Sequence, residues 1–342
     1  MKKTCVFCGK IPKKKNKEHV LPYWLLSLTG DPNRVVKFGF NYSQGKEINF
    51  NWNNFTIASC SHCNDKYANF ENKVKSIIVK LMNKTEIDSN EALELLDWLD
   101  KVRIGLWLNY YYLEKNKAQI DPRLTVENRM GKKDRFMQIH FLESDREQQG
   151  LNAFGVETFL FQINPACFGL RINNILLING SNDFIISENC GFPFPKKINS
   201  HKNGMLELQE WEYNRNVSKR INGSNLHKGV LTLLQPIQAQ VDYETNLFSD
   251  SYLIENCIDN EKRIGTIFRF LEDYVIPVHD FDMKLNYESV RGEDINYIGE
   301  LISKVYELQN TSLLKLKSRS DKLLDEIIEL NKKHIDFYKR LS

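Results

Sequence analysis

Residues 5–8 read Cys-Val-Phe-Cys and residues 60–64 read Cys-Ser-His-Cys-Asn, and these two stretches decide how the first part of the chain folds. A Cys-x-x-Cys turn presents two thiolates to one metal ion, and two such turns complete the tetrahedral four-sulfur shell that zinc prefers. The four cysteines are therefore predicted to hold one structural zinc ion: Cys5, Cys8, Cys60 and Cys63. Because a four-thiolate shell has no vacant position, this ion is not expected to take part in catalysis.

The charged residues are distributed unevenly along the chain. The 342 residues carry a formal charge of only +3, and 42% of them are hydrophobic, which is ample for a packed core. Residues 1–83, however, hold 14 Lys and Arg against 5 Asp and Glu, whereas residues 84–342 hold 33 against 39. A basic segment followed by an acidic one indicates that the N-terminal part meets a polyanion.

The sequence is expected to carry no signal for export or membrane insertion. No apolar run approaches the roughly 18–20 residues that cross a bilayer, and the lysine-rich start lacks the apolar stretch of a signal peptide. Paired cysteines in a chain without an export signal favour metal binding over disulfides. We therefore expect a cytoplasmic protein without a membrane partner.

Hydrophobic periodicity predicts an α+β protein. Short strands and turns are expected over residues 34–58, a helix over 64–82, and a second, longer helix over 88–113 that starts at the capping-box pattern Asp88-x-x-Glu91. Short apolar runs separated by turn signals predict a small sheet over 136–190, and the C-terminus is expected to be helical from about residue 293. We accordingly expect an N-terminal module (1–83), a helical connector (84–135) and an α+β domain (136–342) for targeting, sensing or oligomerisation.

The last helix can be interpreted in two ways. Apolar or aromatic side chains recur at alternating spacings of four and three, as in a coiled-coil seam: Leu323, Ile327, Leu330, His334, Phe337 and Leu341. The stripe is broadened by Leu324, Ile328, Ile335 and Tyr338, which favours an ordinary amphipathic helix packed on its own domain. A homodimer formed through the C-terminal region is compatible with the first interpretation.

The zinc ion would bring two polar sites on the intervening loop into useful positions. Glu18 and His19 follow the first cysteine pair, and Asn64 directly follows the last cysteine at the start of a helix. A neutral imidazole can take a proton from water, and oxygen ligands can hold Mg²⁺ against a phosphate. A histidine, a carboxylate and an amide around one pocket would therefore suit hydrolysis of a phosphodiester.

These motifs resemble the HNH endonuclease family, the zinc-stapled branch of the ββα-metal (His-Me finger) nucleases. The resemblance covers about residues 1–80 and rests on the two cysteine pairs, Glu18-His19-Val20-Leu21-Pro22 with the following Tyr23-Trp24, Cys63-Asn64, and Phe70-Glu71. It implies a ββα-metal nuclease module that hydrolyses DNA with Mg²⁺ or Mn²⁺ and leaves 5′-phosphate and 3′-hydroxyl ends. RNA is a possible substrate of the same chemistry.

The resemblance also implies roles for individual residues. His19 would be the general base, and Asn64 and Glu18 would be ligands of the catalytic divalent ion. The family's middle Asn, which orients the histidine loop, would fall at position 55, where this chain has Phe; Asn54, or else Asn53, is expected to replace it. Glu71 could share a helix face with Asn64, as a metal-site residue or as a solvated carboxylate.

A lysine cluster beside the expected site is predicted to contact nucleic-acid phosphates: Lys13, Lys14, Lys15 and Lys17. The same lysines could instead form a solvated loop. An HNH module joined to a separate domain is similar to bacterial restriction and anti-phage defence effectors. The competing interpretation is a non-catalytic zinc module that binds nucleic acid or protein, which would need the cysteines and lysines but neither His19 nor Asn64.

Overall fold

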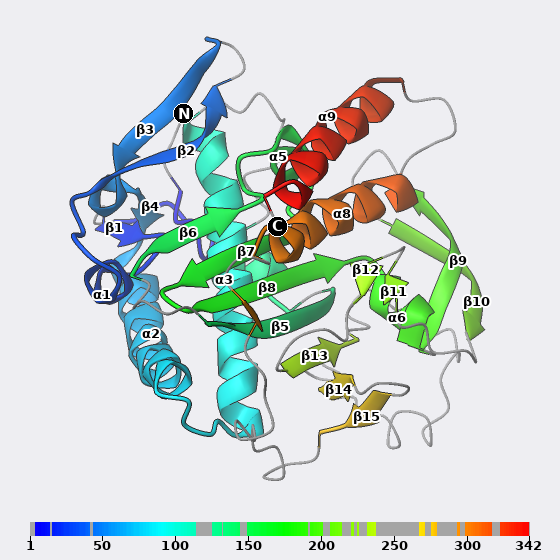
Figure 1. Cartoon of the computed structure of the whole chain (residues 1–342), viewed down its shortest axis with the longest axis horizontal. Coiled ribbons are helices and arrows are strands. Elements are labelled where there is room, and N and C mark those ends of the chain that lie inside the picture. Colours follow the sequence, from blue (N-terminus) through cyan, green and yellow to red (C-terminus); the bar gives the residue numbers. More distant parts are fainter. Residues whose placement is uncertain are drawn as a thin grey trace.

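The computed structural model describes most of the chain, with gaps. The described residues are 4–13, 16–41, 44–113, 125–131, 133–143, 149–190, 192–200, 206–213, 220–221, 224–225, 231–236, 267–270, 275–278, 293–294, 298–316 and 322–341. Helices and strands are mixed throughout, so the predicted α+β class is confirmed (Figure 1). No helix among these residues has the length and apolar character that crossing a membrane requires.

The N-terminal part is built from short strands and two helices. Strand β1 (Asn16–His19) pairs antiparallel with β4 (Thr56–Ser59), and β2 (Val35–Asn41) forms a hairpin with β3 (Lys46–Asn51). Helix α1 (Tyr23–Leu28) follows β1, and the 3₁₀ turn η1 (Trp52–Asn54) precedes β4. Helix α2 (Ser61–Met82) begins at the second cysteine pair, close to where the sequence predicts a helix.

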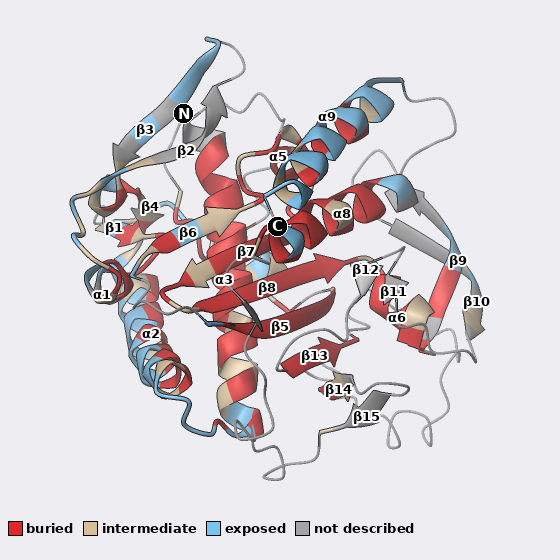
Figure 2. Cartoon of the chain, in the orientation of Figure 1, coloured by how far each residue is buried: buried red, intermediate tan, exposed pale blue. Residues whose placement is uncertain are grey.

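The predicted capping box begins the longest helix, α3 (Ser89–Leu113). The backbone N–H of Glu91 donates to Asp88 Oδ1 at 2.9 Å, and the N–H of Asp88 donates to Glu91 Oε2 at 3.1 Å. These reciprocal bonds satisfy two N–H groups that the helix start leaves without intrahelical partners. Behind this cap, α3 is buried over most of its length, in contrast to α2, whose outer face is exposed (Figure 2).

A large antiparallel sheet occupies the centre of the molecule. Its strands lie in the order β15-β14-β13-β5-β8-β7-β6, and β16 joins β5 in parallel. The bounds of these strands are β5 Asp134–Glu143, β6 Leu151–Phe154, β7 Cys167–Ile172, β8 Ile175–Asn182, β13 Leu231–Gln235, β14 Phe268–Phe270, β15 Val275–Pro277 and β16 Glu293–Asp294. The sheet is thus wider than the one expected over residues 136–190.

Helices cover both faces of this sheet. Ile175 and Leu177 of β8 pack in the same core as α3, whereas Leu176 and Ile178 face α8 (Ile298–Leu316). Successive side chains of a strand point to opposite faces, so the continuous apolar run of β8 contributes side chains to the hydrophobic cores on both faces of the sheet. Figure 1 shows α3 passing behind strands β7, β8 and β5.

The remaining elements lie around this centre. Helix α4 (Val126–Arg129) follows α3, and two further short helices are α5 (Phe159–Ile163) and α6 (Ile185–Cys190). Strands β9 (Pro193–Ser200) and β10 (Leu206–Tyr213) form one hairpin, and β11 (Arg220–Ile221) pairs with β12 (Ser224–Asn225). Helix α9 (Lys322–Lys339) packs on α8 at the edge of the molecule (Figure 1).

The main hydrophobic core is continuous across the expected domain boundaries. One cluster of buried side chains runs from Phe7 and Leu25 near the N-terminus, through Ile78 of α2 and Leu99 of α3, to Leu233 of the sheet. The divisions expected at residues 83/84 and 135/136 therefore coincide with no break in the core. Residues 1–83 bury part of their apolar surface against the rest of the chain rather than only against themselves.

Candidate functional site

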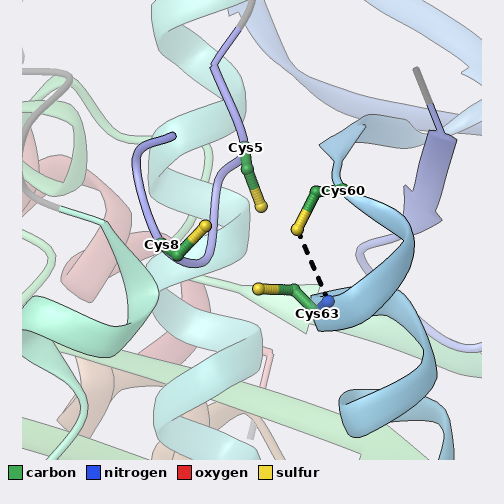
Figure 3. A group of neighbouring side chains, drawn as sticks. All are labelled: Cys5, Cys8, Cys60 and Cys63. Carbon is green, nitrogen blue, oxygen red and sulfur yellow. Dashed lines mark hydrogen bonds between the residues drawn. The ribbon is translucent and has the colours of Figure 1, made fainter. Parts of the chain in front are cut away.

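The structure brings the four predicted cysteines together (Figure 3). The sulfur atoms of Cys5, Cys8, Cys60 and Cys63 all lie within 4.8 Å of one another. Four ligands at the usual zinc–sulfur distance of about 2.3 Å, in a tetrahedron, place their sulfur atoms about 3.8 Å apart. The six described cysteines are free thiols rather than disulfides. The residues present thus fit a metal ion such as zinc.

Backbone hydrogen bonds position both cysteine pairs. In the first turn, the N–H of Gly9 donates to Cys5 O at 2.8 Å, and Gly9 has a φ of +72°, a conformation that glycine adopts at little cost. In the second, Cys60 is the N-cap of α2, and its Sγ accepts from the N–H of Cys63 (dashed line in Figure 3). Both turns aim their sulfur atoms at one point.

The first cysteine turn lies between two other segments. The N–H of Val6 donates to Ala58 O of β4 at 2.9 Å, whereas the carbonyl of Val6 accepts from Val126 at 3.0 Å and that of Phe7 accepts from Glu127 at 3.1 Å. The turn is therefore anchored to α4 as well as to the module around it. Nothing in the cysteine spacing predicts this contact, because it joins residues about 120 positions apart.

His19 ends β1, and its half-buried ring is held by one residue. Its Nε2 lies 3.0 Å from the backbone oxygen of Asn53 and 3.1 Å from Asn53 Oδ1. A backbone carbonyl can only accept, so Nε2 must carry the proton that it donates. In the neutral ring, Nδ1 then keeps its lone pair and can act as a base. The ring of Tyr23 lies 6.4 Å away between centroids.

The residue that orients His19 is Asn53 and not Asn54. Asn54 is exposed at the end of η1, whereas Asn53 contacts the imidazole and is itself fixed. Its N–H donates to Pro32 O at 3.1 Å, and its Nδ2 donates to Asn33 Oδ1 at 3.4 Å. The sequence offered both neighbours as candidates; the 3₁₀ turn, which rotates successive side chains by about 120°, decides between them.

Glu18 lies on the opposite face of β1 from His19. It is 7% exposed, and its Oε1 accepts from Lys101 Nζ of α3 at 3.0 Å. The same ammonium group also donates to Glu71 Oε1 of α2. The structure thus places Glu18 and Glu71 around a buried lysine rather than beside the His19 ring, which does not support the expected role of Glu18 as a ligand of a catalytic ion.

This buried group has two carboxylates and one ammonium, which leaves one negative charge in excess if all three are ionised. Burial raises the pKa of Glu71 to about 6; the nearby Lys101 lowers it, and Glu18 raises it further. The Lys101 ammonium also lies over two aromatic rings, 5.6 Å from the centroid of Phe7 and 5.7 Å from that of Tyr67. The sequence did not predict a role for Lys101. The available signal was a lysine among closely spaced Leu, Ile, Val and Trp residues of the 88–113 helix, because a lysine buried in such a helix must be paired.

Asn64 lies at the other end of the β1–β4 ladder from His19. Its Oδ1 accepts from the hydroxyl of Ser59 at 3.2 Å, and Ser59 pairs with Asn16, whereas His19 pairs with Thr56. Ser59 and Thr56 are three residues apart, which corresponds to about 10 Å along a strand. The structure therefore does not bring the Asn64 amide against the His19 ring, as the resemblance implied.

The lysines of the expected phosphate-contact segment are only partly described. Lys13 and Lys17 are exposed, and Lys14 and Lys15 lie outside the described residues. Because strand side chains alternate, Lys17 shares the face of β1 that carries His19 and not the face that buries Glu18. A cationic side chain and the imidazole thus point to the same side of the strand.

Comparison of the chain with family models, with curated proteins and with solved structures finds no match in any of the three.

Proposed function

We propose that the N-terminal part of this protein is an HNH-type nuclease in which His19 is the general base that activates water for hydrolysis of a phosphodiester bond. The observation that carries the proposal is the anchoring of His19 Nε2 to the backbone oxygen of Asn53 at 3.0 Å. This bond selects the tautomer with a free Nδ1 and holds the ring in one orientation. A general base needs both properties before substrate arrives.

The chemistry of the proposed step is as follows. Nδ1 of His19 removes a proton from water as the water oxygen attacks phosphorus, and the bond from phosphorus to the 3′ oxygen breaks. The departing 3′ oxygen takes a proton from solvent, and the phosphate remains on the 5′ side. The zinc ion that the four cysteines would hold has a complete shell and serves to fix the fold around β1 and α2.

Among the described His, Cys, Asp and Glu side chains, no group that could hold the expected divalent ion lies beside His19. Within the described ranges, the group of His, Cys, Asp and Glu side chains that could hold a metal is the four-cysteine cluster. Glu18 is bonded to Lys101 and Asn64 to Ser59. The proposed step therefore uses side chains of this chain alone. Cleavage measured with Mg²⁺, with Mn²⁺ and with EDTA determines whether a divalent ion is required.

The charge distribution supports a nucleic acid as the substrate. Residues 1–83 have nine more basic than acidic side chains, and exposed Lys17 lies on the His19 side of β1. Contacts from lysine to phosphate fix the position of a nucleic acid without reading its sequence. Binding through such contacts releases condensed counterions from the nucleic acid. Added salt opposes this release, so the affinity falls steeply as the salt concentration rises.

The proposal is tested with the purified, zinc-loaded full-length chain on plasmid DNA and on labelled single-stranded DNA and RNA, with Mg²⁺, with Mn²⁺ and with EDTA. His19→Ala is expected to lower the cleavage rate by about 10²-fold or more, since general bases contribute that much. His62→Ala is the matched control, because His62 is exposed on α2. This variant should cleave at the wild-type rate. Equal cleavage by wild type and His19→Ala would overturn the proposal.

A second candidate is a zinc module that binds nucleic acid without cutting it. It is favoured by the positions of Glu18 and Asn64, both of which bond to other residues of the fold. In that case, wild type and His19→Ala would bind DNA equally and neither would cleave any substrate. Lys17→Glu would weaken binding under both functions, so cleavage rather than binding separates them.

A further inference from the structure

The last helix, α9, has an apolar stripe in addition to the face with which it packs. Its buried side chains are Ile327, Ile328, Asn331 and Ile335. Asn331 Nδ2 donates to Tyr306 O of α8 at 3.0 Å and to Asn310 Oδ1 at 2.9 Å, which fixes that face against α8. Three other large apolar side chains remain exposed: Leu323 at 62%, Leu330 at 52% and Phe337 at 57%.

The exposed side chains form one line. Leu323, Leu330 and Phe337 are spaced by seven residues, which is 20° short of two full turns. At 1.5 Å per residue, the line is about 21 Å long and nearly parallel to the helix axis. Figure 2 shows exposed residues along the outer side of α9. Single exposed apolar residues are common on protein surfaces, but an aligned set marks a contact surface.

The charges beside the stripe indicate what covers it. Glu326 and Lys333 are exposed, again seven residues apart, and flank the stripe on the side away from α8. Leu330 is the midpoint between Leu323 and Phe337. If a second α9 ran antiparallel about a two-fold axis beside Leu330, Leu323 would meet the partner's Phe337, and Leu330 would meet its own symmetry mate.

The same axis places opposite charges together. Glu326 lies four residues before Leu330, so it faces the position four residues after Leu330 in the partner. Lys333 lies three residues after Leu330, so Glu326 and the partner's Lys333 differ in height by about one residue's rise. Symmetry repeats this pair on the other side of the axis. A parallel arrangement would instead set Glu326 against Glu326 and Lys333 against Lys333. We propose that α9 is the contact surface between two copies of this chain, paired antiparallel about Leu330.

The size of the surface sets the expected strength. One helix that contributes three apolar side chains buries well under the roughly 1,600 Å² of a standard interface. The dimer should therefore be weak, with a dissociation constant in the micromolar range, and its population should depend on protein concentration. The inference stands on α9 alone and does not require that His19 be catalytic; if it is, the dimer carries two such sites.

Sedimentation equilibrium of the zinc-loaded full-length chain tests the proposal. Leu330→Glu should raise the dissociation constant roughly tenfold or more, because it places a charge at the centre of the contact. Glu326→Lys and Lys333→Glu should each weaken the dimer, and the double variant should restore it. Lys332→Glu is the matched control, since Lys332 is one residue from Lys333 but faces away from the stripe, and it should leave the dimer unchanged.

Contrary results would overturn either the contact surface or the antiparallel arrangement. A wild-type chain that is monomeric up to about 100 µM, or a Leu330→Glu variant that dimerises like wild type, overturns the contact surface. Charge reversals that have no effect singly, or that fail to compensate in the double variant, overturn the antiparallel arrangement. Because all the altered side chains are exposed, thermal unfolding of each variant should match that of wild type.

Discussion

Replacing Lys101 by Met is expected to destabilise the protein strongly at pH 8 and only slightly at pH 5. Lys101 is 3% exposed and is the cation between Glu18 and Glu71, which are each 7% exposed. Met has a similar length and apolar character, so it keeps most of the packing against Phe7 and Tyr67 but removes the charge. Two buried carboxylates would then have no compensating cation.

The pH dependence follows from the titration of Glu71. In the wild type, burial raises the pKa of Glu71 from 4.5 to about 6. This shift makes ionised Glu71 unfavourable by about 2 kcal/mol relative to an unfolded chain. Because the folded-state pKa is the higher one, the stability from protonated Glu71 is complete below pH 4.5 and is lost as the pH rises through 6.

Removing Lys101 takes away the nearby cation that lowers the pKa of Glu71, so the loss increases at high pH. Each carboxylate that must stay protonated costs up to about 1.4 kcal/mol per pH unit above its unfolded pKa. Loss of one partner of a buried ion pair typically costs about 3–5 kcal/mol, and we expect this range for Lys101→Met at pH 8. At pH 5, where Glu71 protonates at little cost, we expect about 1 kcal/mol.

The assay is urea unfolding at pH 5 and pH 8, followed by tryptophan fluorescence with zinc in excess. Lys73→Met is the matched control: Lys73 Nζ also joins α2 to α3, through Glu94 at 2.9 Å, but its side chain is 66% exposed. An exposed pair contributes about 0–1 kcal/mol, so this variant should resemble wild type at both pH values. The reasoning fails if Lys101→Met costs no more than Lys73→Met, or if its cost is the same at both pH values.

Three further predictions concern the metal cluster, a buried histidine and the orientation of His19. Cys60→Ser should lower the zinc content and expose residues 1–83 to limited proteolysis, and a chelator should do the same to wild type; unchanged proteolysis after complete zinc removal would contradict a structural ion. His140 is fully buried with no hydrogen-bond partner among the described residues, and burial lowers its pKa to about 3. His140→Leu should therefore raise the free energy of unfolding by about 1–3 kcal/mol at pH 7. It should also remove the part of the stability loss between pH 6.5 and 3 that comes from protonating His140. A variant that loses stability with acid as steeply as wild type would refute this. Finally, nitrogen chemical shifts should show the Nε2-protonated tautomer of His19, altered by Asn53→Ala but not by Asn54→Ala, and an Nδ1-protonated ring would exclude the proposed base.

Local sequence signals predicted the parts of the fold that depend on neighbouring residues. The two Cys-x-x-Cys turns converge as their pattern predicted, because each turn is a local structure and four thiolates can share one ion. The capping box at Asp88 forms as expected, since it involves only residues three apart. The continuous apolar run over 175–178 indicated a strand, and the structure shows why it does not alternate: both of its faces are covered.

The parts that the sequence did not predict depend on contacts between distant residues. Glu18 precedes His19 by one position, and from spacing alone the two could share a pocket; the strand pleat separates them, and Lys101, 83 residues away, determines where Glu18 lies. In α9, periodicity located the apolar positions but not which of them would be covered by α8. Ile327 became buried and Leu330 did not, although both belonged to the same expected seam.

The position of Lys101 also bears on how the C-terminal part could influence the proposed site. Glu18 and His19 are neighbours on β1, so the bond from Lys101 to Glu18 ends one residue from the imidazole. Lys101 belongs to α3, and the same helix packs against β8 of the large sheet. A shift of α3 relative to α2 would leave Glu18 or Glu71 as a buried charge without its partner, so such a shift must either move β1 as well or be energetically costly. A displacement of α3 would therefore disturb β1, the strand that carries His19, through this buried ammonium group.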